Sequence, residues 1–160
     1  MISPNVQELR TAFSYDYSTG KLYRKMAGGF SEQPISISSN GYARVGFQYK
    51  RYGAHRVAWA LVTGRWPELD IDHINGIRDD NRLCNLRHVD RSTNLENTRT
   101  AKSHNKSSGV LGVSVSPKGL ITSRIKISGV DMYLGSFKSV EDASAAYLEA
   151  KRSFHKGATV

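Results

Sequence analysis

The alternation of apolar and polar residues in the first third of the chain predicts one short helix followed by short strands. Apolar residues recur at helical spacing over residues 3–13, where Ser3 can cap the helix. Aromatic residues flank a turn within residues 15–23, which predicts a strand on each side. Residues 26–40 are rich in Gly and Ser, and we expect a loop with one weak strand at most. Strict alternation over 42–49, directly after an Asn-Gly turn signal, predicts a half-buried strand.

The middle of the chain changes to a helical period and then returns to strands. Apolar residues of segment 52–63 share one helical face, and Gly64 marks the expected end of that helix. Residues 69–74 and 86–89 have the composition of strands, with a polar loop between them. Capping residues then favour a helix over about 90–100. The predicted order is strand, loop, strand, helix.

The last third of the chain has a separate pattern. A segment rich in basic residues, 100–108, predicts a linker, with contacts to phosphates along it as the alternative. Three strands are then predicted at 110–116, 120–127 and 131–134, the last one ending at Gly135, followed by a helix capped by Ser139. We expect one face of this sheet to pack on the helix and the other to be polar.

Charge narrows the choice of partner. The chain has 23 Lys and Arg residues against 14 acidic ones, a formal net charge of +9. This excess favours a polyanion, either nucleic acid or an anionic membrane surface. The single cysteine, Cys84, excludes an intrachain disulfide and a cysteine-based zinc site, and we expect its thiol to be buried. With neither a signal-peptide pattern nor a membrane-length apolar segment, we expect a cytoplasmic protein.

Residues 71–97 are dense in groups that bind hard cations and move protons. Asp72 and Asn94 offer side-chain oxygens, and Mg²⁺ prefers a few such ligands while it retains several waters. The adjacent His73 has an ordinary pKa near 6.5, so it can accept a proton from water at neutral pH. An oxygen of Asn85 can hold the other ring nitrogen. Taken singly, each of these residues is more commonly a turn or capping residue, and the combination carries the hypothesis.

Further residues are weaker candidates for this chemistry. Arg56 and Arg87 are candidates for contacts to phosphate. His55 can contact phosphate or metal, although a packed or capping histidine is the commoner case. Asn97 can be an additional ligand, although a solvent-facing helix residue is the simpler expectation.

A resemblance to a known family adds to this interpretation. The sequences Asp72-His73-Ile-Asn-Gly, Asp80-Asn81-Arg82, Asn85-Leu86-Arg87 and Ser92-Thr-Asn94 resemble the HNH endonuclease motif, most closely that of phage and intron-borne homing endonucleases. The resemblance implies a ββα-metal fold around one divalent cation, Mg²⁺ or Mn²⁺. It implies that Asp72 and Asn94 are metal ligands, that His73 is the general base and that Asn85 orients that base. The third motif letter is Asn94 here instead of His, as in several family members.

The C-terminal segment 107–157 resembles the AP2 DNA-binding domain. The residues that carry the resemblance are Gly112-Val113, Arg124-Ile125, Tyr133-Leu134-Gly135-Ser-Phe137, Val140-Glu141-Asp142-Ala143, Ala145-Ala146-Tyr147 and Gly157. The resemblance implies contact with duplex DNA through the outer face of the sheet. The implied contact residues are Ser114, Ser116, Lys118, Arg124, Lys126 and Tyr133.

The sequence therefore predicts an α+β protein with three parts. Residues 1–99 form a β-rich region with an HNH ββα-metal motif, 100–108 a basic linker, and 109–160 an AP2-like module of three strands and one helix. The predicted activity is metal-dependent hydrolysis of duplex DNA, by nicking or double-strand cutting, as a monomer or homodimer with no evident protein partner. A non-catalytic, sequence-specific DNA-binding regulator is the alternative, and an RNA-binding protein is a more distant one.

Overall fold

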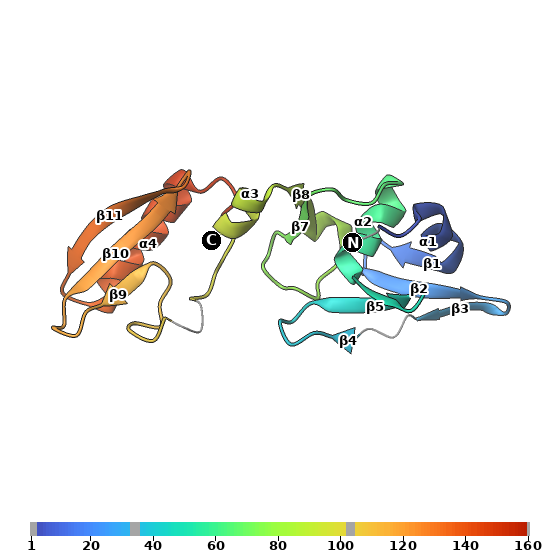
Figure 1. The fold of residues 1–160 in the computed structure, drawn as a ribbon, viewed down its shortest axis with the longest axis horizontal. Helices are drawn as coiled ribbons and strands as arrows, with labels where there is room; N and C mark the ends of the chain where they lie inside the picture. The colour runs from blue at the N-terminus through green and yellow to red at the C-terminus, as the bar shows by residue number, and fades with distance from the viewer. Residues whose placement is uncertain (1–2, 33–35, 102–104, 160) are drawn as a thin grey trace. The chain divides into compact units, whose positions relative to one another are not determined.

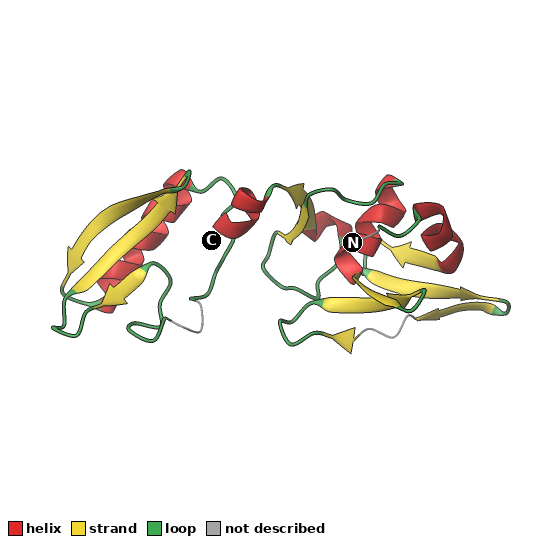
Figure 2. Cartoon of the chain, viewed as in Figure 1, coloured by secondary structure: helices red, strands yellow, loops and turns green. Residues whose placement is uncertain are grey.

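The computed structural model describes residues 3–32, 36–101 and 105–159 of the chain. These residues form a mixed α/β structure of small antiparallel sheets and short helices (Figures 1 and 2). The chain divides into two compact units, Met1–Asp90 and Arg91–Val160, whose positions relative to one another are not determined. The predicted boundaries at residues 99 and 108 stay a prediction, and residues 102–104 of the predicted linker lie outside the described part.

The first unit consists of small sheets with two helices packed on them. Sheet β1-β2-β3 and sheet β4-β5-β6 have three strands each, and β7 pairs with β8. The elements are α1 (Val6–Ala12), β1 (Phe13–Asp16), β2 (Lys21–Met26), β3 (Gly29–Glu32), β4 (Ser36–Ile37), β5 (Ala43–Phe47), β6 (Lys50–Gly53), α2 (Ala54–Thr63), β7 (Asp70–His73), the 3₁₀ helix η1 (Leu83–Asn85) and β8 (Leu86–Val89).

Two apolar clusters hold this unit together. The larger one joins α1, α2 and the strands β1, β2 and β5, with Leu9, Phe13 and Val57 at most 1% exposed. A smaller one joins α2 to the β7–β8 pair through Ala58, Ile71 and Leu86. The second cluster fixes the strand pair against α2, and this pair ends in the residues predicted to be catalytic.

Element boundaries agree with the sequence pattern where local signals are strong. Helix α2 ends at Gly64, which adopts a left-handed conformation with φ of +76° and donates its N–H to the Ala60 carbonyl. Helix α1 begins later than predicted, because Asn5 and not Ser3 caps it by accepting from the Gln7 N–H at 2.9 Å. The prediction of one weak strand at most within 26–40 is wrong, because both β3 and β4 form there.

The second unit is a three-stranded sheet with one long helix. Its elements are α3 (Arg91–Glu96), β9 (Val113–Val115), β10 (Ile121–Ile127), β11 (Val130–Phe137) and α4 (Val140–Phe154). The strand order is β11-β10-β9, and α4 packs on one face of the sheet (Figure 2). Ile125, Tyr147 and Ala150 form the centre of this core. Ser139 caps α4 as predicted, by accepting from the Asp142 N–H at 3.0 Å.

Two sequence expectations fail on detail. Gly135 was expected to end the last strand, but β11 continues to Phe137, and the register shifts opposite Ser123 and Arg124. A glycine in a strand can mark such a bulge as well as an end.

The thiol of Cys84 is exposed and not buried. Within the described residues, no helix has the length and apolarity that crossing a membrane requires.

Candidate functional site

The strand pair β7–β8 presents Asp72 and His73 inside the first unit. The two strands pair so that Asp72 lies opposite Arg87 and His73 opposite Leu86. Asp72 is 8% and His73 3% exposed, which is unusual for two consecutive polar residues. Buried polar groups are costly unless they are paired, so their partners decide what they can do.

Asp72 forms an ion pair with the residue across the strand pair. The Nε and Nη2 atoms of Arg87 both donate to Oδ2 of Asp72, at 2.9 and 2.7 Å. Cross-strand neighbours are close enough for this contact. The arginine therefore orients the carboxylate and holds it by one of its two oxygens.

His73 is hydrogen bonded to Asn81, with 3.1 Å between Nε2 and Oδ1. Asn81 Nδ2 donates to the main-chain oxygen of Asp79, which turns its amide oxygen toward the ring. An amide oxygen only accepts, so Nε2 of His73 carries the proton and Nδ1 carries the lone pair. Burial lowers the pKa of His73 below 6.5, and the contact with Asn81 opposes this shift. The ring is thus neutral at pH 7.

The loop that carries Asn81 is anchored to the N-terminal hairpin. The Tyr15 hydroxyl donates to the Asn81 carbonyl at 2.7 Å, and burial raises the pKa of Tyr15 to about 12. Gly20, with φ of +77°, lies so close that a Cβ there would meet the Arg82 nitrogen at 2.6 Å. Segments more than sixty residues apart in the sequence therefore fix the partner of His73.

Asn85 braces the same loop from the other side. Its Oδ1 accepts from the Asn75 N–H at 2.8 Å, and its Nδ2 donates to the Asp80 carbonyl at 2.7 Å. Asp80 in turn binds Arg82, which lowers the pKa of the carboxyl to about 2. The Asn85 side chain thus binds the loop. The side chain hydrogen bonded to Nε2 of His73 is that of Asn81. Its predicted role as the orienting residue stays a prediction.

A cluster of aromatic rings packs beside His73. The His55 ring lies 5.2 Å from the His73 ring, and the Tyr42 ring lies within 6 Å of both. His55 Nδ1 is buried with no hydrogen-bond partner among the described residues. Burial lowers the pKa of His55 to about 3, with His73 as a smaller cause. A Cβ at Gly53 would lie 2.7 Å from the His55 ring, so this packing requires glycine there.

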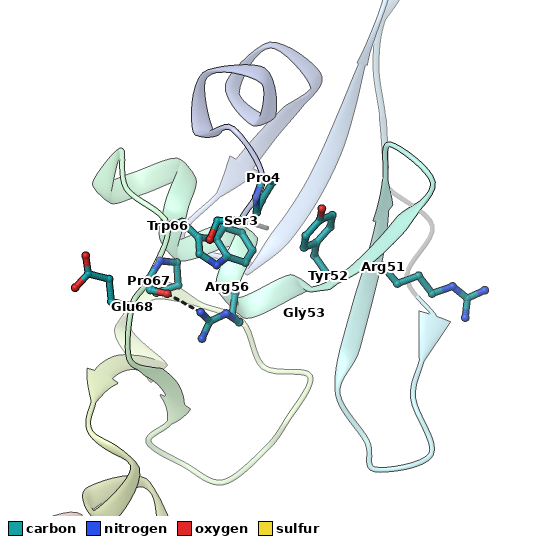
Figure 3. Close-up of a pocket in the computed structure, with 9 residues that line it drawn as sticks. All are labelled: Ser3, Pro4, Arg51, Tyr52, Gly53, Arg56, Trp66, Pro67 and Glu68. Atoms are coloured by element: carbon teal, nitrogen blue, oxygen red, sulfur yellow. Dashed lines mark hydrogen bonds between the residues drawn. The ribbon is translucent and has the colours of Figure 1, made fainter. Parts of the chain in front are cut away.

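Arg56 is used within the fold. Its Nη1 and Nη2 donate to the carbonyls of Leu69 and Pro67, at 2.9 and 2.6 Å, and its guanidinium lies over the Trp66 ring. These contacts close the connection between α2 and β7. Arg56 also lines a cavity of about 580 Å³, drawn with its lining residues in Figure 3. Asp72, His73 and Asn85 do not line this cavity.

The remaining predicted residues belong to the second unit. Asn94 is half-buried on α3, so the structure brings Asp72 and His73 together but leaves their separation from Asn94 open. The expectation that Asn97 is a solvent-facing helix residue is wrong: it follows α3, is buried, and its Oδ1 accepts from the Thr159 hydroxyl at 2.9 Å. The predicted DNA-contacting residues lie on the sheet and its first turn, all exposed except the half-buried Ser116: Ser114, Ser116, Lys118, Arg124, Lys126 and Tyr133.

Sequence reasoning missed three features of this site. They are the bond between His73 and Asn81, the ion pair between Asp72 and Arg87, and the packing of His55 on His73. The ion pair could have been anticipated from the sequence, because two antiparallel strands joined by a loop place Asp72 opposite one residue of β8. The contacts of Asn81 and His55 depend on how loops and helix pack, and residue spacing does not contain that information.

Comparison with known proteins identifies the same stretch. Residues 52–96 match the family model described as HNH endonuclease. No curated protein matches the chain. Among solved structures, the chain is similar to the HNH homing endonuclease I-HmuI, described for its DNA binding and cleavage, at 23% identity and a TM-score of 0.47. That match covers 98% of this chain and 95% of the other. The segment that contains Asp72, His73, Asn85 and Asn94 is therefore similar to HNH endonucleases.

Proposed function

We propose that the protein is a DNA endonuclease of the HNH homing type, with a hydrolytic centre at Asp72 and His73. One observation carries the proposal: a carboxylate held by Arg87 and a neutral imidazole held by Asn81 occupy consecutive positions at the buried end of β7. The match of residues 52–96 to HNH endonucleases supports the same conclusion.

His73 acts as the general base in this proposal. With Nε2 donating to Asn81, Nδ1 is the atom that takes a proton from the attacking water. Burial favours the neutral ring, so the base is ready at pH 7. Asn85 acts as a positioning residue, because it braces the loop of Asn81 and its main-chain oxygen accepts from the N–H of Ile74.

The donor atoms fit a hard divalent cation. Among the described residues, no three His, Cys, Asp or Glu side chains are grouped so that they could hold a metal ion, so the proposed ligand set includes an amide. Asp72 and Asn94 would hold one Mg²⁺ or Mn²⁺ ion through side-chain oxygens. Such an ion, when bound, neutralises charge on the scissile phosphate and on the leaving 3′ oxygen.

The second unit serves as the DNA-binding part in this proposal, through an AP2-like module at 109–160. Support comes from its sheet, where Arg124, Lys126 and Tyr133 are exposed on the face that α4 does not cover. Arg56 and Arg87 are weaker candidates for phosphate contacts, since both donate to groups of the chain itself.

Replacement of His73 tests the proposed reaction. His73→Ala is expected to abolish cleavage of plasmid DNA in Mg²⁺ while duplex affinity changes less than about twofold, because the base is not a binding group. His88→Ala is the matched control, since the described contacts of His88 on the neighbouring strand are with Trp59 and the Leu69 N–H and not with Asp72 or His73, and it should cut at the wild-type rate. Excess EDTA should stop the wild type. Cleavage by His73→Ala at the wild-type rate would exclude His73 as the base.

A DNA-binding regulator without catalysis is the second candidate. The ion pair favours it, because Arg87 satisfies the charge of Asp72 inside the chain. The same plasmid assay separates the two functions: wild-type protein that binds duplex DNA but produces no nicks or new ends in Mg²⁺ or Mn²⁺ is a regulator.

A further inference from the structure

The hairpin between β5 and β6 has an unusual turn. Its two central residues, Gln48 and Tyr49, both have positive φ, of 47° and 60°. Phe47 pairs with Lys50 across the turn, so the loop is two residues long. Tight hairpins of this type favour Asn and Gly, because most side chains are strained at positive φ. Strain of this kind in a bulky residue is often retained for a functional reason.

The side chain of Tyr49 has no structural role that offsets this strain. Its relative exposure is 110%, whereas Tyr52 a few residues later is half-buried against the Trp66 ring. An aromatic ring that is fully exposed at a strained position gains nothing from burial within this unit.

The turn is nevertheless held firmly by the rest of the unit. Gln48 Nε2 donates to a carboxylate oxygen of Glu8 on α1, at 2.6 Å. Phe47 is buried, with its ring 5.7 Å from that of Phe13. The turn that carries Tyr49 is therefore held in one conformation. This lowers the entropy cost of ordering the turn when Tyr49 binds a partner.

Basic residues outnumber acidic ones in the hairpin that carries the exposed ring. No acidic residue occurs in the sequence between Glu32 and Glu68. Lys50 follows Tyr49 directly, and Arg44 and Arg51 are exposed on the same two strands. Figure 3 shows Arg51 extending away from the cavity. Glu8, which binds Gln48, supplies one carboxylate at this turn, against the three basic residues of the two strands. The hairpin thus combines an aromatic ring with an excess of cations, a combination suited to nucleic acid, where bases stack and phosphates are anionic.

We propose that the β5–β6 hairpin is a second DNA-contacting surface, in which Tyr49 inserts as a wedge at a base step of duplex DNA and stacks on the partly unstacked bases. Lys50 and Arg51 contact the flanking phosphates. The choice of duplex DNA as partner rests on the proposed function, but the contact itself does not depend on catalysis. It places DNA recognition in the first unit as well as on the sheet of the second.

The substitution Tyr49→Gly separates binding from stability. Glycine tolerates positive φ, so the unfolding midpoint of the first unit should rise, as followed by the fluorescence of Trp59 and Trp66, both in this unit. Affinity for a fluorescein-labelled duplex of mixed sequence, measured by anisotropy in EDTA, should fall by at least about fivefold. The dependence of affinity on salt should keep its slope, because the tyrosine is uncharged.

Matched variants complete the test. Tyr17→Ala removes another exposed tyrosine of the same unit and should leave affinity unchanged, whereas Arg51→Ala should reduce the salt slope by about one. Wild-type affinity in Tyr49→Gly, or a loss confined to single-stranded DNA, would overturn the proposal. Because binding is measured without metal, a wild type that never cuts defeats the proposed nuclease and leaves this inference standing.

Discussion

The two units bury polar residues for different purposes. In the second unit, two buried titratable residues bind main-chain carbonyls: Lys151 donates to that of Thr98, and His155 pairs with that of Lys126. In the first unit, two buried titratable residues bind side chains: Asp72 binds Arg87, and His73 binds Asn81. Hydrogen bonds to main-chain carbonyls hold two segments of the chain together. Contacts between two side chains fix the orientation of the titratable group. The partner of a buried polar group thus says more about its role than its burial does.

The largest effect expected from this difference is that of Asp72→Ala. The change removes the Asp72 carboxylate from the half-buried Arg87 guanidinium, and the free energy of unfolding of the first unit should fall by about 2 kcal/mol. Cleavage should be lost as well. Urea unfolding followed by tryptophan fluorescence measures the first effect, and a plasmid nicking assay measures the second.

Two further variants separate charge from chemistry in that experiment. Asp72→Ala combined with Arg87→Met should regain most of the stability, since an apolar pair replaces the ions, but no cleavage. Lys151→Met in the second unit should change stability by less than about 1 kcal/mol, as measured by hydrogen exchange of β10, because its partner is an uncharged carbonyl. An equal loss in Asp72→Ala and Lys151→Met would erase the distinction between the units.

The sequence anticipates the fold best where signals are local. The end of α2 at Gly64 and the cap of α4 at Ser139 depend on conformations that one residue favours by itself. Strands β3 and β4 were not foreseen in full, because they exist through pairing with β2 and β5 and have little alternation of their own. Strand formation of this kind depends on distant residues.

The candidate site divides in the same way. Asp72 and His73 were predicted as site residues because a carboxylate and an imidazole are adjacent in a stretch dense in metal-binding groups. Asn81 was noticed only as part of the motif, because its hydrogen bond to His73 depends on a loop that Tyr15 holds from 66 residues away. Contacts that depend on tertiary packing do not show in the pattern of apolar and polar residues along the sequence.

The next largest effect is on the pH dependence of stability in the first unit. Burial lowers the pKa of His55 from 6.5 to about 3, so between these values the unfolded chain binds a proton that the folded chain does not. The free energy of unfolding should therefore fall by about 1.4 kcal/mol for each pH unit below about 6.5. His73, whose pKa is also lowered, adds in the same direction. Urea unfolding at pH 7.5, 6 and 5 measures the slope.

Replacement of His55 assigns this slope to the buried cluster. His55→Phe keeps an aromatic ring but removes the titrating imidazole. The slope of the free energy of unfolding against pH should therefore decrease by the contribution of about one proton. A His55→Phe protein with the wild-type slope would show that His55 is protonated in the folded chain.

The smallest expected effect tests the second unit as a DNA-binding surface. Arg124 is exposed on β10, with its guanidinium 5.6 Å from the Tyr133 ring centre. Arg124→Ala should change stability by less than about 0.5 kcal/mol. It should reduce the slope of log affinity against log salt by about one if Arg124 neutralises one phosphate. Anisotropy titrations of a labelled duplex between 50 and 200 mM salt measure this slope.

Two neighbouring cations show whether the sheet face itself is responsible. Nζ of Lys126 lies 3.8 Å from Oδ2 of Asp131, so its charge is already partly opposed. Lys126→Ala should therefore reduce the slope of log affinity against log salt less than Arg124→Ala does. Arg152 is exposed on α4, which covers the other face of the sheet, and Arg152→Ala should leave the slope unchanged. Equal reductions in all three variants would mean that net charge alone attracts DNA. The second unit would then have no defined binding face, and the hairpin at Tyr49 would be the one local contact left to test.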